Sequence, residues 1–562
     1  MVAAPGSLRI AVAQLNPIVG DVAGNLALAR SVLADPACRD ADLVLFSECF
    51  LSGYPPEDLI LKPAFLAACD EAMRTLAAET TAGPGVVVGV PLQRETGRHN
   101  AVAVLDGGRV IAERYKVDLP NYGEFDERRV FEPGPMPTPV EFRGVKIGAP
   151  ICEDIWGTLG VCEALARAGA ELLLVPNGSP YHRGKLELRR EIATRCVRAC
   201  GRPLIYANQV GGQDELVFDG ASFAVDDMLA LCLQMRQFEA QLVVQTWQRD
   251  SLGSWHPGGG THAKLPEATE ADYRACMLGL RDYVDKNGFE QVLLGLSGGI
   301  DSALCAALAV DALGPKRVWA VMLPYKYTAQ SSLTDAEACA RALGCRYDVV
   351  PIAEPVEGFS HALAGLFAGT HEDVTEENLQ SRTRGTMLMA LSNKFGAMLV
   401  TTGNKSEVSV GYSTLYGDMN GGFNPLKDLY KMQVYALARW RNAKVPIGAL
   451  GPAGEVIPPN ILAKAPSAEL RAEQTDQQSL PPYPVLDEIL ECLVEGEMSV
   501  EEIVARGHEQ ALVLRIEHLL YTAEYKRRQA APGVKITRKH FGRDRRYPIT
   551  NHFRQGSGPA KT

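Results

Sequence analysis

Short apolar runs recur through the first 260 residues of the chain. Runs of this length that are rich in branched residues are typical of strands. The predicted strands are residues 8–14, 43–48, 86–91, 101–105, 145–152, 172–176 and 204–207. Apolar residues with helical spacing lie between several of them, at 23–34, 64–79 and 185–199. This part of the chain is therefore predicted to mix strands with helices.

The pattern changes after residues 255–262, whose glycine and proline content predicts a linker. An amphipathic helix is expected at 268–287, followed by an apolar strand at 292–296. Strand and helix signals then alternate through residues 317–323, 346–350, 387–394 and 398–402. Such alternation predicts a parallel sheet. Because 562 residues are too many for one ordinary core, we expect two domains, 1–260 and 261–562.

A glycine turn follows the strand at 292–296 and leads into a helix. Ser297, Gly298 and Gly299 allow successive backbone N–H groups to converge, and Ser302 adds a hydroxyl, which together form an anion site at a helix N-terminus. Asp301 would repel a bare phosphate, so it indicates a Mg²⁺ ion between carboxylate and phosphate. A glycine-rich turn without a ligand is the alternative, but it does not account for the Ser-Gly-Gly-x-Asp-Ser pattern.

This loop resembles the pyrophosphate loop of the ATP pyrophosphatases, and it is not a Walker loop because no Gly-Lys-[Ser/Thr] follows the glycines. The resemblance implies a doubly wound domain that cleaves ATP between the α and β phosphates. The ATP cradle that it implies comprises Gly295, Leu296, Ser297, Gly298, Gly299, Ile300, Asp301 and Ser302.

Composition narrows the class of protein. The net charge of −10 argues against a general nucleic-acid binder, and no apolar run is long enough for a membrane span. The 13 cysteines have no paired spacing, and the N-terminus lacks the features of a signal peptide. We therefore expect reduced thiols and a cytoplasmic protein.

Three residues of the first part could take part in catalysis, although each alone has an ordinary structural explanation. Cys152 ends a predicted strand, where we expect an exposed thiol whose pKa is lowered by a helix end. Glu48 also ends a predicted strand and can serve as a base, while the Lys116 ammonium can stabilise an oxyanion.

The sequence around these residues resembles the nitrilase superfamily over roughly residues 8–235, including 177–185 and 219–222. The resemblance implies a four-layer α-β-β-α sandwich with amidase activity. It also implies Glu48 as general base, Lys116 as oxyanion stabiliser, Cys152 as nucleophile and Glu127 as a second glutamate that orients the site.

Further segments extend the resemblance over nearly the whole chain, to the glutamine-dependent NAD⁺ synthetases. They are residues 377–385, 401–407, 411–419, 464–470 and 541–549. The family's reaction hydrolyses glutamine to ammonia, adenylates the nicotinate carboxylate of deamido-NAD⁺ with ATP, and forms NAD⁺, AMP and pyrophosphate.

This second resemblance also implies residue roles. Tyr122, Ser179 and Lys185 match glutamine-binding positions, and Thr402 matches an ATP contact. Asn378, Glu407 and Lys526 match deamido-NAD⁺ contacts, although Lys526 also fits ordinary surface charge. Asp301 and Glu407 are the expected Mg²⁺ carboxylates. The family further implies a homo-oligomer with a dimeric synthetase core.

Two other functions remain open at this point. One is a different amidotransferase of the ATP-pyrophosphatase type, such as a GMP or asparagine synthetase, although those carry other glutaminase modules. The other is an amidase fused to a nucleotide-sensing domain, which the pair Asp301 and Glu407 disfavours because sensing needs no metal carboxylates.

Overall fold

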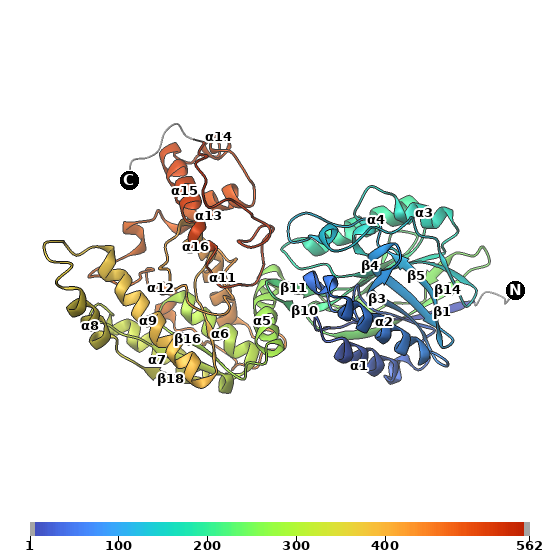
Figure 1. Cartoon of the computed structure of the whole chain (residues 1–562), viewed down its shortest axis with the longest axis horizontal. Helices are drawn as coiled ribbons and strands as arrows, with labels where there is room; N and C mark the ends of the chain where they lie inside the picture. Colours follow the sequence, from blue (N-terminus) through green and yellow to red (C-terminus); the bar gives the residue numbers. More distant parts are fainter. Residues whose placement is uncertain (1–5, 556–562) are drawn as a thin grey trace. The chain divides into compact units, whose positions relative to one another are not determined.

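The computed structural model describes residues 6–555 and divides into two compact units, with the division between Pro266 and Glu267. Figure 1 shows both units, coloured along the sequence. No helix in the described part of the chain is long and apolar enough to cross a membrane.

The larger sheet of the first unit has the strand order β15-β14-β1-β2-β3-β4-β5. Its strands are β1 (Ser7–Gln14), β2 (Leu43–Leu45), β3 (Gly85–Arg94), β4 (Gly97–Asp106), β5 (Arg109–Tyr115), β14 (Gln241–Arg249) and β15 (Trp255–Pro257). Alternate residues of β1 face opposite sides: Ile10 and Val12 enter one core, and Ala11 and Ala13 enter another. The continuous apolar run at residues 10–13 therefore reflects a sheet that is buried on both faces.

The second sheet of this unit has the order β13-β12-β9-β8-β7-β6. Its strands are β6 (Val140–Phe142), β7 (Val145–Gly148), β8 (Leu172–Asn177), β9 (Leu204–Asn208), β12 (Phe223–Val225) and β13 (Leu231–Gln234), and a separate hairpin is formed by β10 (Val210–Gln213) and β11 (Leu216–Asp219). Apolar side chains of the two sheets, such as Val12, Leu45, Ile147 and Leu174, pack together in one core.

Helices cover the outer face of each sheet (Figure 1). They are α1 (Val22–Leu33) and α2 (Pro63–Ala78) on the larger sheet, and α3 (Val161–Arg167) and α4 (Lys185–Cys200) on the smaller one. The layers therefore run α-β-β-α, which confirms the predicted sandwich.

The segment predicted as a linker, residues 255–262, is partly strand. β15 pairs with β14, and the Trp255 side chain is buried in the core between the sheets with 1% of its surface exposed. The linker prediction was wrong here because glycine and proline content does not reveal an aromatic anchor that packs against a distant sheet.

The second unit is built on a parallel sheet with the order β18-β17-β16-β19. Its strands are β16 (Val292–Gly295), β17 (Val318–Met322), β18 (Arg346–Val349) and β19 (Met398–Val400). The chain adds strands in one direction from β16 and then returns to place β19 on the other side. In such sheets, ligands bind at the carboxyl ends of the strands where the order reverses, here between β16 and β19.

Helices lie on both faces of this sheet, as the predicted doubly wound fold requires. Leu293 and Val321 face the helices α8 (Ala353–Leu363) and α9 (Val374–Phe395). The helix α6 (Ile300–Leu313), nearly all of it buried, packs on the other face. The helices of this unit are α5 (Ala268–Lys286), α6 (Ile300–Leu313), α7 (Gln330–Leu343), α8 (Ala353–Leu363), α9 (Val374–Phe395), α10 (Lys405–Val410), α11 (Lys431–Ala443), α12 (Pro459–Ala463), α13 (Tyr483–Val494), α14 (Val500–Val504), α15 (Gln510–Thr522) and α16 (Glu524–Arg527).

Candidate active sites

A buried cation and two carboxylates form the centre of the first unit. Lys116 Nζ lies 2.7 Å from Glu48 Oε1 and 2.8 Å from Glu127 Oε1, and the side chains of Lys116 and Glu48 are 0% exposed. The three residues come from the end of β5, the segment after β2 and a short turn at residues 127–129. The structure thus brings Lys116 and Glu127, which are 11 positions apart, together with Glu48, which is 68 positions from Lys116.

Three further groups hold these carboxylates. Asn100 Nδ2 donates to Glu48 Oε1 at 2.7 Å, the Gly178 N–H donates to Glu48 Oε2 at 2.8 Å, and the Tyr54 hydroxyl donates to Glu127 Oε1 at 2.9 Å. Position 178 accepts only glycine because a Cβ there would lie 2.4 Å from the Tyr54 ring. The sequence analysis assigned no role to Asn100 or Tyr54, since nothing near them in the sequence indicates that they contact the glutamates.

Burial and charge set the proton positions in this cluster. Burial and then repulsion by Glu48 raise the pKa of Glu127, while Lys116 opposes the rise. Burial alone would lower the pKa of Lys116, but the two glutamates outweigh it and raise the pKa. Lys116 is therefore a fixed ammonium in a site that excludes water.

Cys152 is buried rather than exposed, which corrects the sequence expectation. Strand β7 ends at Gly148, and Cys152 instead begins a short turn, with φ of 42° and 6% of its surface exposed. This left-handed backbone is uncommon outside glycine and is found at functional turns. Burial and the charge of Glu48 raise the pKa of the thiol, and Lys116 opposes them. The resting group is a thiol that needs a base, and not a preformed thiolate.

Asp154 ties the cysteine turn to the lysine strand. Its carboxylate accepts hydrogen bonds from the backbone N–H groups of Ile151, Val117 and Asp118, each at 2.9 Å. These residues directly precede Cys152 and directly follow Lys116. Local sequence does not indicate this role, because the segment that Asp154 contacts is more than thirty positions away.

The three residues predicted to contact glutamine differ in burial and in their neighbours. Tyr122 is half exposed and its hydroxyl donates to both carboxylate oxygens of Glu153, at 3.0 and 2.9 Å. Lys185 starts α4, and its Nζ lies 4.3 Å from the centre of the Trp156 ring. Ser179 is buried beyond β8, next to Gly178.

A thiol, a carboxylate base and a fixed ammonium form a set suited to acyl transfer. The thiol supplies a nucleophile, the carboxylate accepts its proton and the ammonium stabilises an oxyanion. The N-terminal unit therefore has the chemical groups needed to cleave an amide.

In the second unit, residues 297–302 form the predicted phosphate loop, which joins β16 to the start of α6. Ser302 Oγ accepts from the Ser297 N–H at 3.2 Å and donates to the Gly299 carbonyl at 3.0 Å, which fixes the turn. Gly298 has φ of 80°, and a Cβ there would lie 2.4 Å from the Ser332 carbonyl oxygen. Glycine at 298 is thus required both by its backbone conformation and by the close approach of the segment at α7.

A lysine links the two predicted metal carboxylates. Lys431 Nζ lies 2.5 Å from Asp301 Oδ2 and 3.0 Å from Glu407 Oε1, and Asn404 Nδ2 donates to Asp301 Oδ1 at 2.8 Å. Burial raises the pKa of Glu407 to about 7, with Lys431 opposing and Asp301 adding to the rise. The sequence analysis gave Lys431 no role, because one lysine among many carries no recognisable signal.

These groups border a cavity of about 310 Å³ at the carboxyl ends of β16 and β19. The residues that line it include the predicted ATP cradle, Gly295 to Ser302, together with Thr402, Glu407 and Lys431. This is the position that the reversal of strand order predicts for a ligand.

Asn378 and Lys526 are not among the residues described as lining this cavity. Both instead hold the segment 411–414 that borders it. Lys526 Nζ donates to the carbonyls of Gly411 and Ser413 at 2.8 and 2.6 Å, and Asn378 Oδ1 accepts from the Thr414 hydroxyl at 2.9 Å. Lys526 is therefore not a free surface charge.

Comparison with known families assigns each unit separately. Residues 9–257 match the carbon-nitrogen hydrolase family, and residues 272–530 match the NAD synthase family. The first match covers the Glu48–Lys116–Cys152 cluster and the second covers the phosphate loop.

Characterised relatives match over nearly the whole chain. The glutamine-dependent NAD(+) synthetase of Rhodobacter capsulatus is 53% identical, over 98% of this chain and 99% of its own, and that of Thermotoga maritima is 42% identical, over 98% and 99%. The solved structure of the Acinetobacter baumannii glutamine-dependent NAD⁺ synthetase, in complex with ADP, is 39% identical with a TM-score of 0.76, and covers 98% of this chain and 100% of that one. The chain belongs to the family of glutamine-dependent NAD(+) synthetases.

Proposed function

We propose that this chain forms NAD⁺ from deamido-NAD⁺ and ATP, with ammonia taken from L-glutamine. The observation that carries the proposal is the presence of two chemically distinct sites on one chain. One site is the buried Glu48–Lys116 pair with Cys152, and the other is the phosphate loop with Asp301 and Lys431. The first set suits amide hydrolysis and the second suits ATP chemistry.

In the first unit, Glu48 takes the proton of Cys152 as the sulfur attacks the side-chain amide carbon of glutamine. Lys116 stabilises the oxyanion, the proton passes to the leaving nitrogen, and ammonia departs as the thioester forms. Water then cleaves the thioester and releases glutamate. The raised pKa of the Cys152 thiol supports a base-dependent first step.

Charged groups beside the nucleophile match the two charged groups on the α-carbon of glutamine. The carboxylate of Glu153, held by Tyr122, is suited to the α-ammonium, and the Lys185 ammonium is suited to the α-carboxylate. Ser179 supplies a hydroxyl for a hydrogen bond to the same substrate.

In the second unit, the nicotinate carboxylate attacks the α-phosphorus of ATP, which yields an acyl-adenylate and pyrophosphate. Ammonia then attacks the carbonyl carbon and AMP leaves. The N-terminus of α6 and the Lys431 ammonium border the same cavity and are placed to neutralise phosphate charge. The N–H groups of Ser297 and Gly299 instead donate within the loop, to Ser302 Oγ and Ser297 Oγ. Thr402 lines the same cavity and supports a role in ATP binding.

Mg²⁺ fits this second site. At nucleotide sites the ion is held by one or two carboxylates together with substrate phosphates, and Asp301 and Glu407 both border the cavity beside the phosphate loop. No group of three or more His, Cys, Asp or Glu suited to a metal occurs within residues 6–555, so phosphates would complete the coordination. When bound, Mg²⁺ supplies neutralisation of phosphate charge.

We also propose that Asn378, Glu407 and Lys526 contribute to the deamido-NAD⁺ site, the first and last through the segment 411–414. A homo-oligomer with a dimeric synthetase core and a cytoplasmic location complete the proposal. None of the 13 cysteines, all of which lie within residues 6–555, forms a disulfide, which supports a reducing compartment.

A substrate screen tests the proposal against its alternatives. Pyrophosphate release should depend on nicotinate adenine dinucleotide and not on xanthylate or aspartate. Release with xanthylate or aspartate would identify a different amidotransferase. ATP binding without pyrophosphate release under any of these conditions would identify a nucleotide-sensing domain.

The oxyanion and base roles predict large losses in glutaminase rate. Lys116→Ala removes a fixed positive donor and should cost about a hundredfold or more. Glu48→Gln leaves the thiol without its base and should cost at least as much. Glutamate release at saturating glutamine measures both. Near-normal turnover in either variant would reject the assigned roles.

The pH dependence of glutamine binding follows from Glu153. Burial raises the pKa of Glu153 to about 7, with Lys116, Tyr122 and Lys185 opposing and Asp118 adding to the rise. Below this pKa the carboxyl becomes neutral and loses its attraction for the α-ammonium. We therefore expect KM for glutamine to rise about tenfold from about pH 8 to about pH 6, with a smaller change in kcat.

The matched variant is Glu153→Gln, which has no group to titrate at this position. Its KM should be high at both pH values. If its KM kept the pH dependence of the parent protein, another group would be responsible and the assignment of Glu153 would be wrong.

A further inference from the structure

Arg189 and Asp219 form an ion pair in the interior of the first unit. Arg189 Nη1 lies 2.7 Å from Asp219 Oδ1, and both side chains are 0% exposed. Arg189 lies on α4 and Asp219 ends β11. A fully buried ion pair is seldom the most stable choice, because desolvation of both charges offsets most of their attraction. Its presence therefore suggests a task beyond stability.

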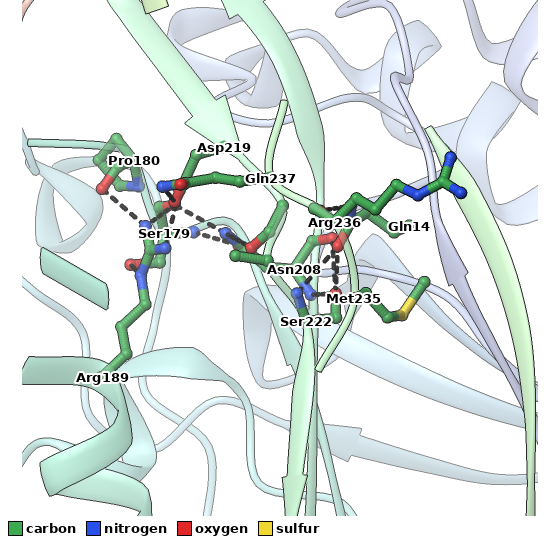
Figure 2. Close-up of polar contacts among 12 residues, drawn as sticks. Gln14, Ser179, Pro180, Arg189, Asn208, Asp219, Ser222, Met235, Arg236 and Gln237 are labelled. Carbon is green, nitrogen blue, oxygen red and sulfur yellow. Dashed lines mark hydrogen bonds and ion pairs between the residues drawn. The ribbon is translucent and has the colours of Figure 1, made fainter. Parts of the chain in front are cut away.

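The other donors of Arg189 all point at one short segment (Figure 2). Nε donates to Ser179 Oγ at 3.0 Å, and Nη2 donates to the carbonyls of Ser179 and Pro180 at 2.6 and 2.8 Å. The planar guanidinium can satisfy these acceptors and Asp219 at the same time, which an ammonium cannot do. Gln237 Nε2 in turn donates to Asp219 Oδ2 at 2.8 Å and fixes the carboxylate.

Asn208, at the end of β9, holds Ser179 as well. The Ser179 N–H donates to Asn208 Oδ1 at 2.9 Å, and Asn208 Nδ2 donates to the Ser179 carbonyl at 3.0 Å. The N–H, the carbonyl and the hydroxyl oxygen of Ser179 therefore all have fixed partners. Because Oγ accepts from Arg189, the hydroxyl proton must point away from the guanidinium, where a ligand competes with the neighbouring Tyr206 hydroxyl to accept it.

The same segment reaches the catalytic base. Gly178, which precedes Ser179, donates its N–H to Glu48 Oε2 at 2.8 Å. Glu48 also accepts from Lys116 and Asn100, so it keeps two donors if the segment shifts. Movement of the segment should therefore affect the Ser179 hydroxyl more than it affects the base.

We propose that Arg189, held by Asp219, is a positioning residue that directs the Ser179 hydroxyl toward the glutamine substrate. The inference rests on the proposed role of Ser179 in glutamine binding. It assigns Arg189 and Asp219 to glutamine affinity, and it gives them no direct contact with the substrate.

The test separates positioning from stability with a double variant. Arg189→Met alone leaves a buried, unpaired carboxylate and should lower Tm strongly. Arg189→Met/Asp219→Leu removes both charges and should recover much of that Tm, but it does not restore the donors to Ser179. We expect its KM for glutamine to be about tenfold above that of the parent protein, with kcat changed less than about threefold.

Ammonium-dependent NAD⁺ formation belongs to the other unit and should be unchanged in the double variant. The recovered Tm and the retained kcat for glutamate release are the checks that the first unit is folded. Arg190→Met is the matched control, because this neighbouring arginine of α4 donates to Gln234 rather than to Ser179. It should leave KM for glutamine at the parent value. If the double variant fails to fold, Arg189→Lys provides the same test, since it keeps the charge beside Asp219 but loses the planar set of donors.

Ser179→Ala distinguishes failure of the inference from failure of the proposed function. If Ser179→Ala leaves KM unchanged, the proposed role of Ser179 is wrong. If it raises KM but the double variant does not, the positioning role of Arg189 is wrong. If both raise KM, adding Ser179→Ala to the double variant should produce no further rise, because the two changes remove one interaction. Additive effects would overturn the inference.

Discussion

The Cys152→Ala variant is expected to lose glutamine-dependent NAD⁺ formation and to keep most of its ammonium-dependent activity. Cys152 is the residue for which we propose the thioester, beside the Glu48–Lys116 pair. Alanine removes its sulfur with little change in volume. The phosphate loop lies in the other unit and is not altered. The measurement is NAD⁺ formation with saturating glutamine and, separately, with ammonium.

Cys162→Ala is the control for this variant. Cys162 is another buried cysteine of the same unit, in α3 and outside the Glu48–Lys116 cluster. Its substitution should leave both activities in place. Loss of both activities in a folded Cys152→Ala protein would contradict the separate roles of the two units.

The Asp301→Asn variant is expected to lose NAD⁺ formation with either nitrogen source. Asparagine keeps the size of the side chain but removes the charge that faces Lys431 and that would bind Mg²⁺. Because adenylation precedes the attack of ammonia, the supply of ammonia cannot rescue it. We expect pyrophosphate release to fall by about a hundredfold or more.

Glutamate release should survive in this variant, at least in part, because Glu48, Lys116 and Cys152 belong to the first unit. Pyrophosphate and glutamate are therefore measured in one preparation. Asp285→Asn is the control, since Asp285 forms a surface ion pair with Arg317 in the same unit. Normal pyrophosphate release from Asp301→Asn would contradict both the proposed metal binding by Asp301 and the proposed phosphate binding by the loop.

Local sequence was sufficient to predict the elements that carry both sites. The loop between β16 and α6 could be predicted because strand, glycine turn and helix follow one another within a dozen residues. The strand β1 could be predicted because residues 10–13 form a short apolar run, which is typical of strands. In these cases the determining contacts are close in sequence or repeat with the period of the element.

Sequence was insufficient where distant residues decide the environment. Cys152 was expected to be exposed because it follows a strand, but it is buried against Glu48 and Lys116, and its pKa rises instead of falling. Lys431 and Asn100 contact the carboxylates of Asp301 and Glu48, which are 130 and 52 positions away. A single lysine or asparagine carries no local signal of such a contact, so only the fold reveals it.

The central claim is that one chain joins a glutaminase to an ATP-dependent synthetase. It is tested most directly with the unmodified protein, ATP, deamido-NAD⁺ and glutamine labelled with ¹⁵N at the side-chain amide. The account predicts ¹⁵N in the nicotinamide of the product, with AMP and pyrophosphate formed in amounts equal to NAD⁺. Without glutamine, unlabelled ammonium should also support NAD⁺ formation. Failure to form NAD⁺ with either nitrogen source, or NAD⁺ formed from glutamine without the label, would contradict the account.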